Sequence, residues 1–309
     1  SDYALEIKQS GFSVYEHNSI NVEQRVIYVS GMLLSMQDIM DNDQVIQRGL
    51  VPDDLRGLQT SSKRDGTQIY NQIEEFLKAR DIPQNKLIIM LGLFKNVIQL
   101  DSSRDELINL DKIIAKQIDT TKASITKQIF TYIFENIYKS IDGASTLDIM
   151  GEMYSEFLKY ALGDGKEIGI VLTPPYITKM MADILDINKD SRVMDLATGS
   201  AGFLIASMEK MIADTNSNYG QNTDNANEKI NQIKHNQLLG IEYDSKMFTL
   251  AATNMILRGD GSAQIQKGSS FDRPESLYKE FNADRLLLNP PFTYDENGMP
   301  FIKFGLDHM

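Results

Sequence analysis

The residues from Asn289 to Phe292 have the types and spacing to hold a planar group that carries an amine. They follow three leucines, and a buried strand cannot continue through the two prolines, because proline has no N–H to donate. The Asn289 amide oxygen and the Pro290 carbonyl could accept hydrogen bonds from one exocyclic NH₂ group, while Phe292 offers a flat face for a ring. Pro290 and Pro291 stiffen the loop. The stretch therefore indicates a site for an amino-bearing base.

A second stretch, DLATGSAG from Asp195 to Gly202, also follows an apolar run. Glycine in such a turn allows backbone conformations that other residues avoid, and it lets a ligand approach the main chain. The turn leads into a helix N-terminus, where unpaired N–H groups and the helix dipole favour an anion. Two interpretations fit this pattern: a tight turn between a strand and a helix, or a ligand-binding loop.

Glu242 ends the next apolar run, at the distance along the chain expected for the second strand of a nucleotide-binding unit. A carboxylate there can accept hydrogen bonds from both hydroxyls of a ribose. The alternative is that Glu242 caps the following helix, a role that Asp244 could fill instead. The DLATGSAG loop lacks the G-x-G-x-x-G spacing that cradles a pyrophosphate, so the predicted ligand contains a nucleoside and no pyrophosphate.

These three stretches stand where the sequence predicts the ends of strands. From Ile168 onward, apolar runs alternate with amphipathic helical patterns, which is typical of a parallel sheet with crossover helices. A further strand is predicted over 263–268, and a helix over 245–257 that Gly259 can end. Ligands bind outside the carboxyl ends of strands in such sheets, so we expect the three stretches to share one site.

The stretch VLTPPYITKMMADIL predicts a helix before the first strand. Thr173 is expected to cap this helix, with Pro174 at its first position, an arrangement that helices favour. Its apolar face is expected to pack on the sheet through Ile177, Met180, Met181, Ile184 and Leu185. Capping accounts for most of the pattern, and nearness to the ligand site is a second interpretation.

The first half of the chain, to about Gly163, has mostly helical periodicity, as in Ile69, Ile73, Phe76 and Leu77. A further helix is predicted over 147–162. We therefore expect a mainly helical region over 1–145 and an α/β domain over 146–309. Within the α/β domain, residues 214–228 are rich in asparagine and poor in apolar side chains, which predicts a mobile surface loop.

Composition limits the classes of protein and of site. The chain has no cysteine and three scattered histidines among 309 residues, which excludes disulfides and argues against a zinc cluster. No apolar run approaches the roughly 20 residues that span a bilayer, and no signal peptide opens the sequence, so we expect a cytoplasmic protein without membrane contact. The net charge of −12 argues against a protein that binds nucleic acid unaided, so a local basic patch or a partner would have to supply the attraction.

In combination and order, GIVLTPPYI, DLATGSAGFL, GIEYD and NPPF resemble the motifs of the N6-adenine DNA methyltransferases. More narrowly, the chain resembles the modification subunit of Type I restriction–modification systems, or a fused single-chain relative, from about Leu147 to the end. The resemblance implies a Rossmann-like sheet that is incomplete after the NPPF motif. An incomplete sheet would expose an unpaired edge, so we expect either that further residues complete the sheet or that this piece alone methylates poorly if at all.

The resemblance also implies S-adenosylmethionine as the methyl donor, with no metal. The residues that it places around the donor are Thr173, Pro174, Asp195, Thr198, Gly199, Ser200, Gly202 and Glu242. Asp195 and the glycines would border the methionine part, and Glu242 the ribose. In the next strand relatives carry an Asp where this chain has Ser269. Ser270, Phe271 or Asp272 would then contact the adenine of the cofactor.

The implied reaction is methyl transfer to N6 of an adenine in DNA, which must first leave the duplex. Asn289, Pro290 and Pro291 would form the loop that holds the amine, and Phe292 would stack on the ring, without a general base. The implied partners are double-stranded DNA, a specificity subunit or fused target-recognition domain, and a restriction or translocase subunit. Three alternatives stay open: methylation of cytosine N4, methylation of a protein glutamine, and a non-catalytic assembly subunit that keeps the fold.

Overall fold

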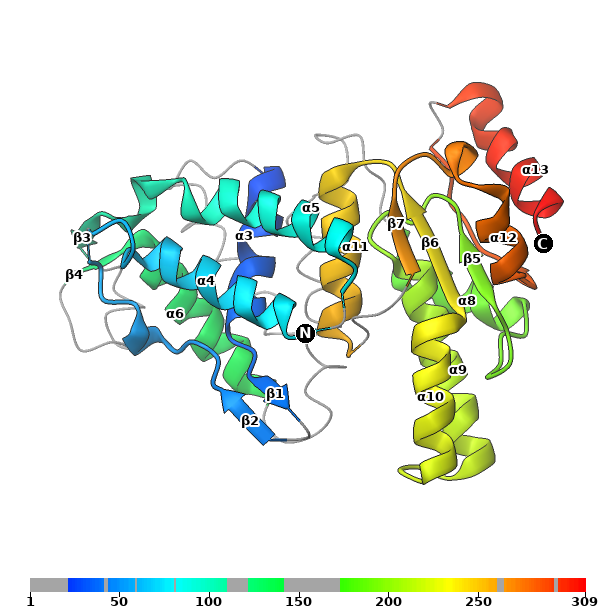
Figure 1. The fold of residues 1–309 in the computed structure, drawn as a ribbon, viewed down its shortest axis with the longest axis horizontal. Helices are drawn as coiled ribbons and strands as arrows, with labels where there is room; N and C mark the ends of the chain where they lie inside the picture. Colours follow the sequence, from blue (N-terminus) through cyan, green and yellow to red (C-terminus); the bar gives the residue numbers. More distant parts are fainter. Residues whose placement is uncertain are drawn as a thin grey trace. The chain divides into compact units, whose positions relative to one another are not determined.

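The structure, a computed structural model, describes residues 22–41, 44–58, 60–80, 82–109, 122–141, 173–259, 264–291 and 294–309. The chain divides into two compact units, Ser1–Ile170 and Val171–Met309 (Figure 1). The helix predicted over 147–162 lies outside the described residues, and so does the predicted boundary between residues 145 and 146. That boundary stays a prediction.

The described part of the first unit is mainly helical. It contains the helices α3 (Val22–Ser35), α4 (Asp65–Lys78), α5 (Gln84–Phe94) and α6 (Ile125–Asn136). It also contains two short antiparallel pairs, β1 (Ile39–Asp41) with β2 (Gln44–Gln47) and β3 (Leu107–Asn109) with β4 (Lys122–Ser124). The apolar residues predicted to share one face of α4 are all buried: Ile69, Ile73, Phe76 and Leu77. Helical spacing therefore identifies the core side of this helix.

The second unit is built on a parallel sheet with the strand order β7-β6-β5-β8. The strands are β5 (Val193–Asp195), β6 (Leu238–Glu242), β7 (Gln264–Lys267) and β8 (Arg285–Leu286). The four predicted strands are confirmed, although β8 is shorter than the run of leucines suggests. The pairing continues one residue further, because the Leu287 N–H donates to the Met194 carbonyl at 3.1 Å. Since β5 lies between β6 and β8, the carboxyl ends of these three strands are neighbours.

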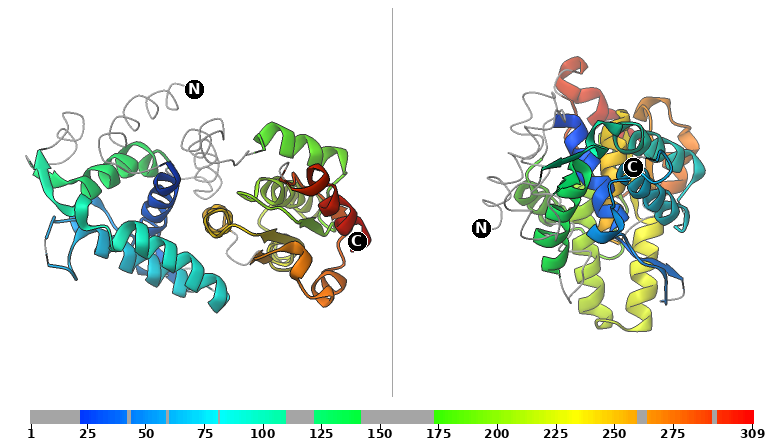
Figure 2. Two further views of the ribbon diagram at one scale, coloured as in Figure 1. Left: turned by 90° about the horizontal axis from the view of Figure 1, so that it is seen from above. Right: turned by 90° about the vertical axis from the view of Figure 1, so that its left-hand side faces the viewer.

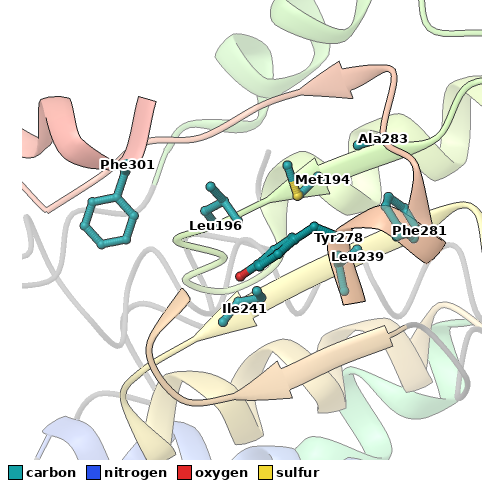
Figure 3. Close-up of a cluster of buried hydrophobic side chains, with 8 residues drawn as sticks. All are labelled: Met194, Leu196, Leu239, Ile241, Tyr278, Phe281, Ala283 and Phe301. Carbon is teal, nitrogen blue, oxygen red and sulfur yellow. The ribbon is translucent and has the colours of Figure 1, made fainter. Parts of the chain in front are cut away.

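Helices pack on both faces of this sheet. They are α8 (Pro175–Ile184), α9 (Gly202–Tyr219), α10 (Asp224–Asn236), α11 (Ser245–Leu257), α12 (Glu275–Phe281) and α13 (Met299–Asp307). Met194, Leu239 and Ile241 point to one face and form a buried cluster with side chains of α12 and α13, as Figure 3 shows. Gly240 turns to the other face, toward Leu204 of α9. None of the described helices is long and apolar enough to cross a membrane.

Gly240 allows the loop after β5 to lie directly on β6. A Cβ at this position would stand 2.6 Å from the Thr198 hydroxyl and 2.8 Å from Leu204. Gly240→Ala is therefore expected to lower the free energy of unfolding by about 1–3 kcal/mol, the usual cost of overpacking. Urea unfolding would measure this change. Gly92→Ala, in α5 with open space around the added Cβ, is the matched control and should be neutral or stabilising.

The prediction of a loop over 214–228 is wrong, because most of this segment is helical. Helix α9 continues to Tyr219 and α10 begins at Asp224, so a short turn replaces the expected loop. The two helices lie side by side (Figure 2). Thr223 caps α10 by accepting from the Ala226 N–H, and Ala226 and Ile233 are buried. Capping and a few buried contacts thus stabilise a helix whose composition is poor in apolar residues.

The packing predicted for α8 is also wrong in part. Met180 and Ile184 are exposed, whereas Thr178 and Ala182 face the protein. The partner of α8 is α9, and the Thr178 methyl lies 3.5 Å from the position of a Cβ on Gly202. Small residues let two helices approach closely, so the buried side of α8 is set by its small side chains rather than by its largest apolar ones.

Candidate functional site

The polar residues singled out at the three predicted strand ends lie on neighbouring strands. Asp195 ends β5, Glu242 ends β6, and Asn289 follows β8 by three residues. The loop from Asp195 to Gly202, called here the glycine loop, runs from β5 to the start of α9. The structure therefore brings the glycine loop and Glu242 together, and the Asn289 loop follows β8, the strand on the other side of β5.

The glycine loop is held in place by hydrogen bonds that its N–H groups donate to acceptors on β6. The Thr198 N–H donates to the Ile241 carbonyl at 3.1 Å, and the Gly199 N–H donates to Oε2 of Glu242 at 2.8 Å. Within the loop, the Thr198 hydroxyl donates to the Asp195 carbonyl at 3.0 Å. Gly199 has a φ of +56°, a left-handed conformation that glycine adopts at little cost. The residues predicted to touch a ligand are thus held in one conformation by the neighbouring strand.

Asp195 is fully buried beneath this loop. Its Oδ1 accepts from the Ala197 N–H at 3.0 Å, while its Oδ2 has no hydrogen-bond partner among the described residues. The pKa of Asp195 is raised to about 8, chiefly because burial disfavours the charged form; the Ala197 hydrogen bond lowers this pKa and the nearby Glu242 carboxylate raises it. A buried polar atom of this kind is suited to a hydrogen-bond partner that a ligand brings.

Glu242, at the end of β6, is hydrogen-bonded to the loop that follows β5. Its Oε2 accepts from Gly199, and its Oε1 accepts from the Asp244 N–H at 2.8 Å. Burial raises the pKa of Glu242, and the two backbone hydrogen bonds counteract that rise. Glu242 is not the helix cap, because Asp244 caps α11 by accepting from the Lys246 and Met247 N–H groups, each at 2.9 Å. The interpretation of Glu242 as the helix cap is therefore wrong, and its role toward a ribose stays a prediction.

Asn289 contacts the start of α8. Its Nδ2 donates to the Thr173 hydroxyl at 3.1 Å, which leaves Oδ1 as the acceptor of this amide. The prediction that Thr173 caps α8 is wrong: Pro174 occupies the cap position, Pro175 is the first helical residue, and no side chain caps the helix. The second proline satisfies the preference for proline at the first position, so the helix starts one residue later than predicted.

The two prolines of the Asn289 loop are in contact with the residues that follow the loop. The Tyr294 N–H donates to the Pro291 carbonyl at 3.0 Å. Gly298, with a φ of +82°, packs against Pro290 so closely that a Cβ would lie 2.6 Å from the proline ring. The loop is thus rigid up to Pro291. Phe292 lies outside the described residues, and its stacking role stays a prediction.

The segment after β7 contains Ser270 and Phe271, the residues predicted to contact the adenine of the cofactor. Ser270 is buried, and its hydroxyl donates to the Leu196 carbonyl at 2.6 Å. The Phe271 ring stacks on Tyr294 with 5.7 Å between centroids and also contacts Phe301. Ser270 therefore connects this segment to the glycine loop by a hydrogen bond, and Phe271 connects it by ring stacking to Tyr294, just after the Asn289 loop.

Sequence reasoning missed one polar residue that contacts the glycine loop. Asn254, in the buried helix α11, donates from Nδ2 to the Ser200 carbonyl at 2.9 Å. The available signal was a single amide within the run ATNMIL, where apolar residues surround it. Periodicity alone assigns such a residue to neither a core nor a site.

This chain is similar in sequence to several known proteins. Residues 145–300 match the family described as N-6 DNA Methylase. The Type II restriction enzyme and methyltransferase RM.BcgI of Heyndrickxia coagulans is 30% identical over 91% of this chain and 40% of its own length. The Type I restriction enzyme EcoEI methylase subunit of Escherichia coli is 24% identical over 85% of this chain and 56% of its own. The chain thus spans about half of these relatives.

One solved structure is similar in fold to this chain. It belongs to a study of complex assembly and conformational transition in the type I R-M system, and it covers 100% of this chain and 61% of its own, with a TM-score of 0.54 and 16% identity. This likeness confirms the predicted fold class, a Rossmann-like methyltransferase sheet with a mainly helical region before it. Since the family match covers half of the sequence, including both loops of the site, the chain belongs to the N-6 DNA methylase family.

Proposed function

We propose that this chain transfers a methyl group from S-adenosylmethionine to N6 of adenine in DNA, as part of a restriction–modification system. The observation that carries the proposal is the position of the rigid Asn-Pro-Pro loop beside two carboxylates on the adjoining strands, in a member of this family. The loop supplies acceptors for an amine, and the carboxylates supply acceptors for a nucleoside donor.

The residues present fit S-adenosylmethionine. The cofactor supplies a methyl group made electrophilic by a positively charged sulfur. Glu242, at the end of β6, is suited to accept from its ribose hydroxyls, and the buried Oδ2 of Asp195 is an acceptor without a partner among the described residues. The N-terminus of α9, which begins at Gly202, favours the carboxylate of its methionine part. Thr173 and Pro174 are proposed to form the outer wall.

The Asn289 loop would act on the adenine. Asn289 donates to Thr173, so its Oδ1 is left to accept from the N6 amine together with the Pro290 carbonyl. The N6 lone pair is delocalised into the ring, and two acceptors on the amine favour a more tetrahedral and more nucleophilic nitrogen. Holding that nitrogen in line with the methyl group supplies much of the remaining rate. Phe292 is proposed to stack on the everted base.

Partners are part of the proposal. With a net charge of −12, this chain has little electrostatic attraction for a duplex, so a specificity subunit or a fused target-recognition domain is proposed to read the bases and contact the phosphates. A restriction or translocase subunit would complete the system. A cytoplasmic location follows from the proposed DNA substrate.

The test is a transfer assay with labelled S-adenosylmethionine, duplex DNA and any partner that copurifies, followed by analysis of the labelled nucleosides. The proposal expects the label on N6-methyladenine. Label on cytosine N4 or on protein glutamine would replace it with one of those reactions. Absence of cofactor binding in calorimetry would instead favour an assembly subunit that keeps the fold.

Glu242→Ala is expected to raise the dissociation constant for S-adenosylmethionine by about 10- to 100-fold, because hydrogen bonds to a charged acceptor contribute about 1.5–3 kcal/mol. Isothermal titration calorimetry would measure the change. The control is Glu228→Ala, which removes an equal charge from the exposed side of α10. Unchanged affinity in the Glu242 variant would remove the ribose assignment.

A further inference from the structure

Asn254 is a buried amide that reaches the glycine loop from a different helix. Its side chain is 2% exposed, and the other residues of α11 from Met247 to Leu257 are buried as well. Burying an amide is costly unless it is hydrogen-bonded. The Asn254 Nδ2 donates to the Ser200 carbonyl at 2.9 Å, across 54 positions of sequence. The bond therefore connects α11 with the glycine loop at one defined atom.

This hydrogen bond fixes one end of the peptide between Ser200 and Ala201. The other end is fixed as well, because the Ala201 N–H donates to the Thr198 carbonyl at 2.9 Å. Carbonyl and N–H belong to one planar unit, so the two bonds together determine its orientation.

The orientation matters because Ala201 is in an unfavourable conformation. Its φ is +70°, in the left-handed region that a residue with a Cβ rarely adopts. Ala201 is fully buried and lies at the cap position of α9, whose first residue is Gly202. The first N–H groups of a helix have no partners within it. The orientation of the Ser200–Ala201 peptide therefore sets the direction of the first N–H groups of α9.

We propose that Asn254 is a positioning residue, which keeps the glycine loop in the conformation that binds S-adenosylmethionine by holding the Ser200 carbonyl. The inference rests on the proposed function of the site. Asn254 acts through Ser200 and has no contact with the ligand. Without it, the strained Ala201 turn would relax, and only a fraction of the molecules would have a binding-competent loop.

The test compares Asn254→Ala with Thr253→Ala, measuring cofactor affinity by calorimetry and thermal stability by scanning calorimetry on the full chain. Thr253 is the neighbouring fully buried residue of the same helix, and its hydroxyl has no hydrogen-bond partner among the described residues. Both changes are expected to lower the melting temperature. Asn254→Ala alone should raise the dissociation constant, by about tenfold if the competent fraction falls to about a tenth.

A double variant separates positioning from a packing role. Ala201→Gly relieves the left-handed strain, so adding it to Asn254→Ala should restore a measurable part of the lost affinity. The inference is overturned if Asn254→Ala binds the cofactor within twofold of the wild type, or if Thr253→Ala loses affinity equally, or if the double variant shows no recovery. Wild-type protein without any cofactor binding would overturn the proposed function itself.

Discussion

Asn289→Ala is expected to lower the rate of methyl transfer by about 100- to 1,000-fold, the usual cost of removing a group that acts on the reacting atoms. The affinity for S-adenosylmethionine should stay within about twofold of the wild type, because Asn289 is proposed to act on the target base, while Asp195 and Glu242 at the ends of β5 and β6 are unchanged. Single-turnover transfer and calorimetry on the same preparation would give both numbers. A variant that lost cofactor affinity instead would show that the loop had been assigned to the wrong ligand.

Two further variants test whether the loss of transfer is specific to the Asn289 amide. Asn227→Ala removes an exposed amide from α10 and should leave transfer unchanged. Thr173→Val removes the hydroxyl that accepts from the Asn289 amide at 3.1 Å. With that partner gone the amide can rotate, so we expect an intermediate loss of about tenfold, the worth of one hydrogen bond that orients a reacting group. Equal losses for Thr173→Val and Asn289→Ala would instead mean that Thr173 has a separate role.

Asp195 is expected to make the stability of the free protein fall as the pH rises. Its ordinary pKa of 3.8 is raised to about 8 in the fold, chiefly by burial. Between these values the folded chain holds a proton that the unfolded chain has lost, so the free energy of unfolding decreases from about pH 4 to about pH 8. Asp195→Asn removes this dependence, since an amide does not titrate and can still accept from Ala197.

The measurement is the melting temperature of both proteins at several pH values across that window. The variant should be more stable than the wild type near pH 8 and nearly equal to it near pH 4, while its cofactor affinity falls. Asp224→Asn, an exposed residue at the start of α10, makes the same change of charge and should show neither effect. Parallel curves for wild type and Asp195→Asn would contradict the assignment of a raised pKa.

Local chemistry was enough to predict much of the second unit. Alternating apolar runs and helical patterns gave the four strands, and Gly259, with a φ of +80°, follows α11 where the sequence indicated an end. Asp244 was recognised as an alternative helix cap because its type and spacing suit that role. These features depend on neighbours within a few residues, so a sequence reports them directly.

Most of the errors concern contacts between distant residues. The sequence did not show that Thr173 faces Asn289, which lies 116 positions away, instead of its own helix. The buried side of α8 depends on how closely α9 approaches, and the helical state of 214–228 depends on packing between α9 and α10. Asn254 was missed because its partner is a main-chain carbonyl, and backbone atoms have no letter in a sequence.

The contact between Phe271 and Tyr294 has a consequence for how the two substrates are handled. One ring comes from the segment that follows β7, and the other comes from the chain just beyond the Asn-Pro-Pro turn. Because Ser270 also donates to the Leu196 carbonyl, the segment after β7 contacts both the glycine loop and the chain beyond the Asn-Pro-Pro loop. In the proposed reaction, displacing this one segment would disturb the loop for the donor and the loop for the target together.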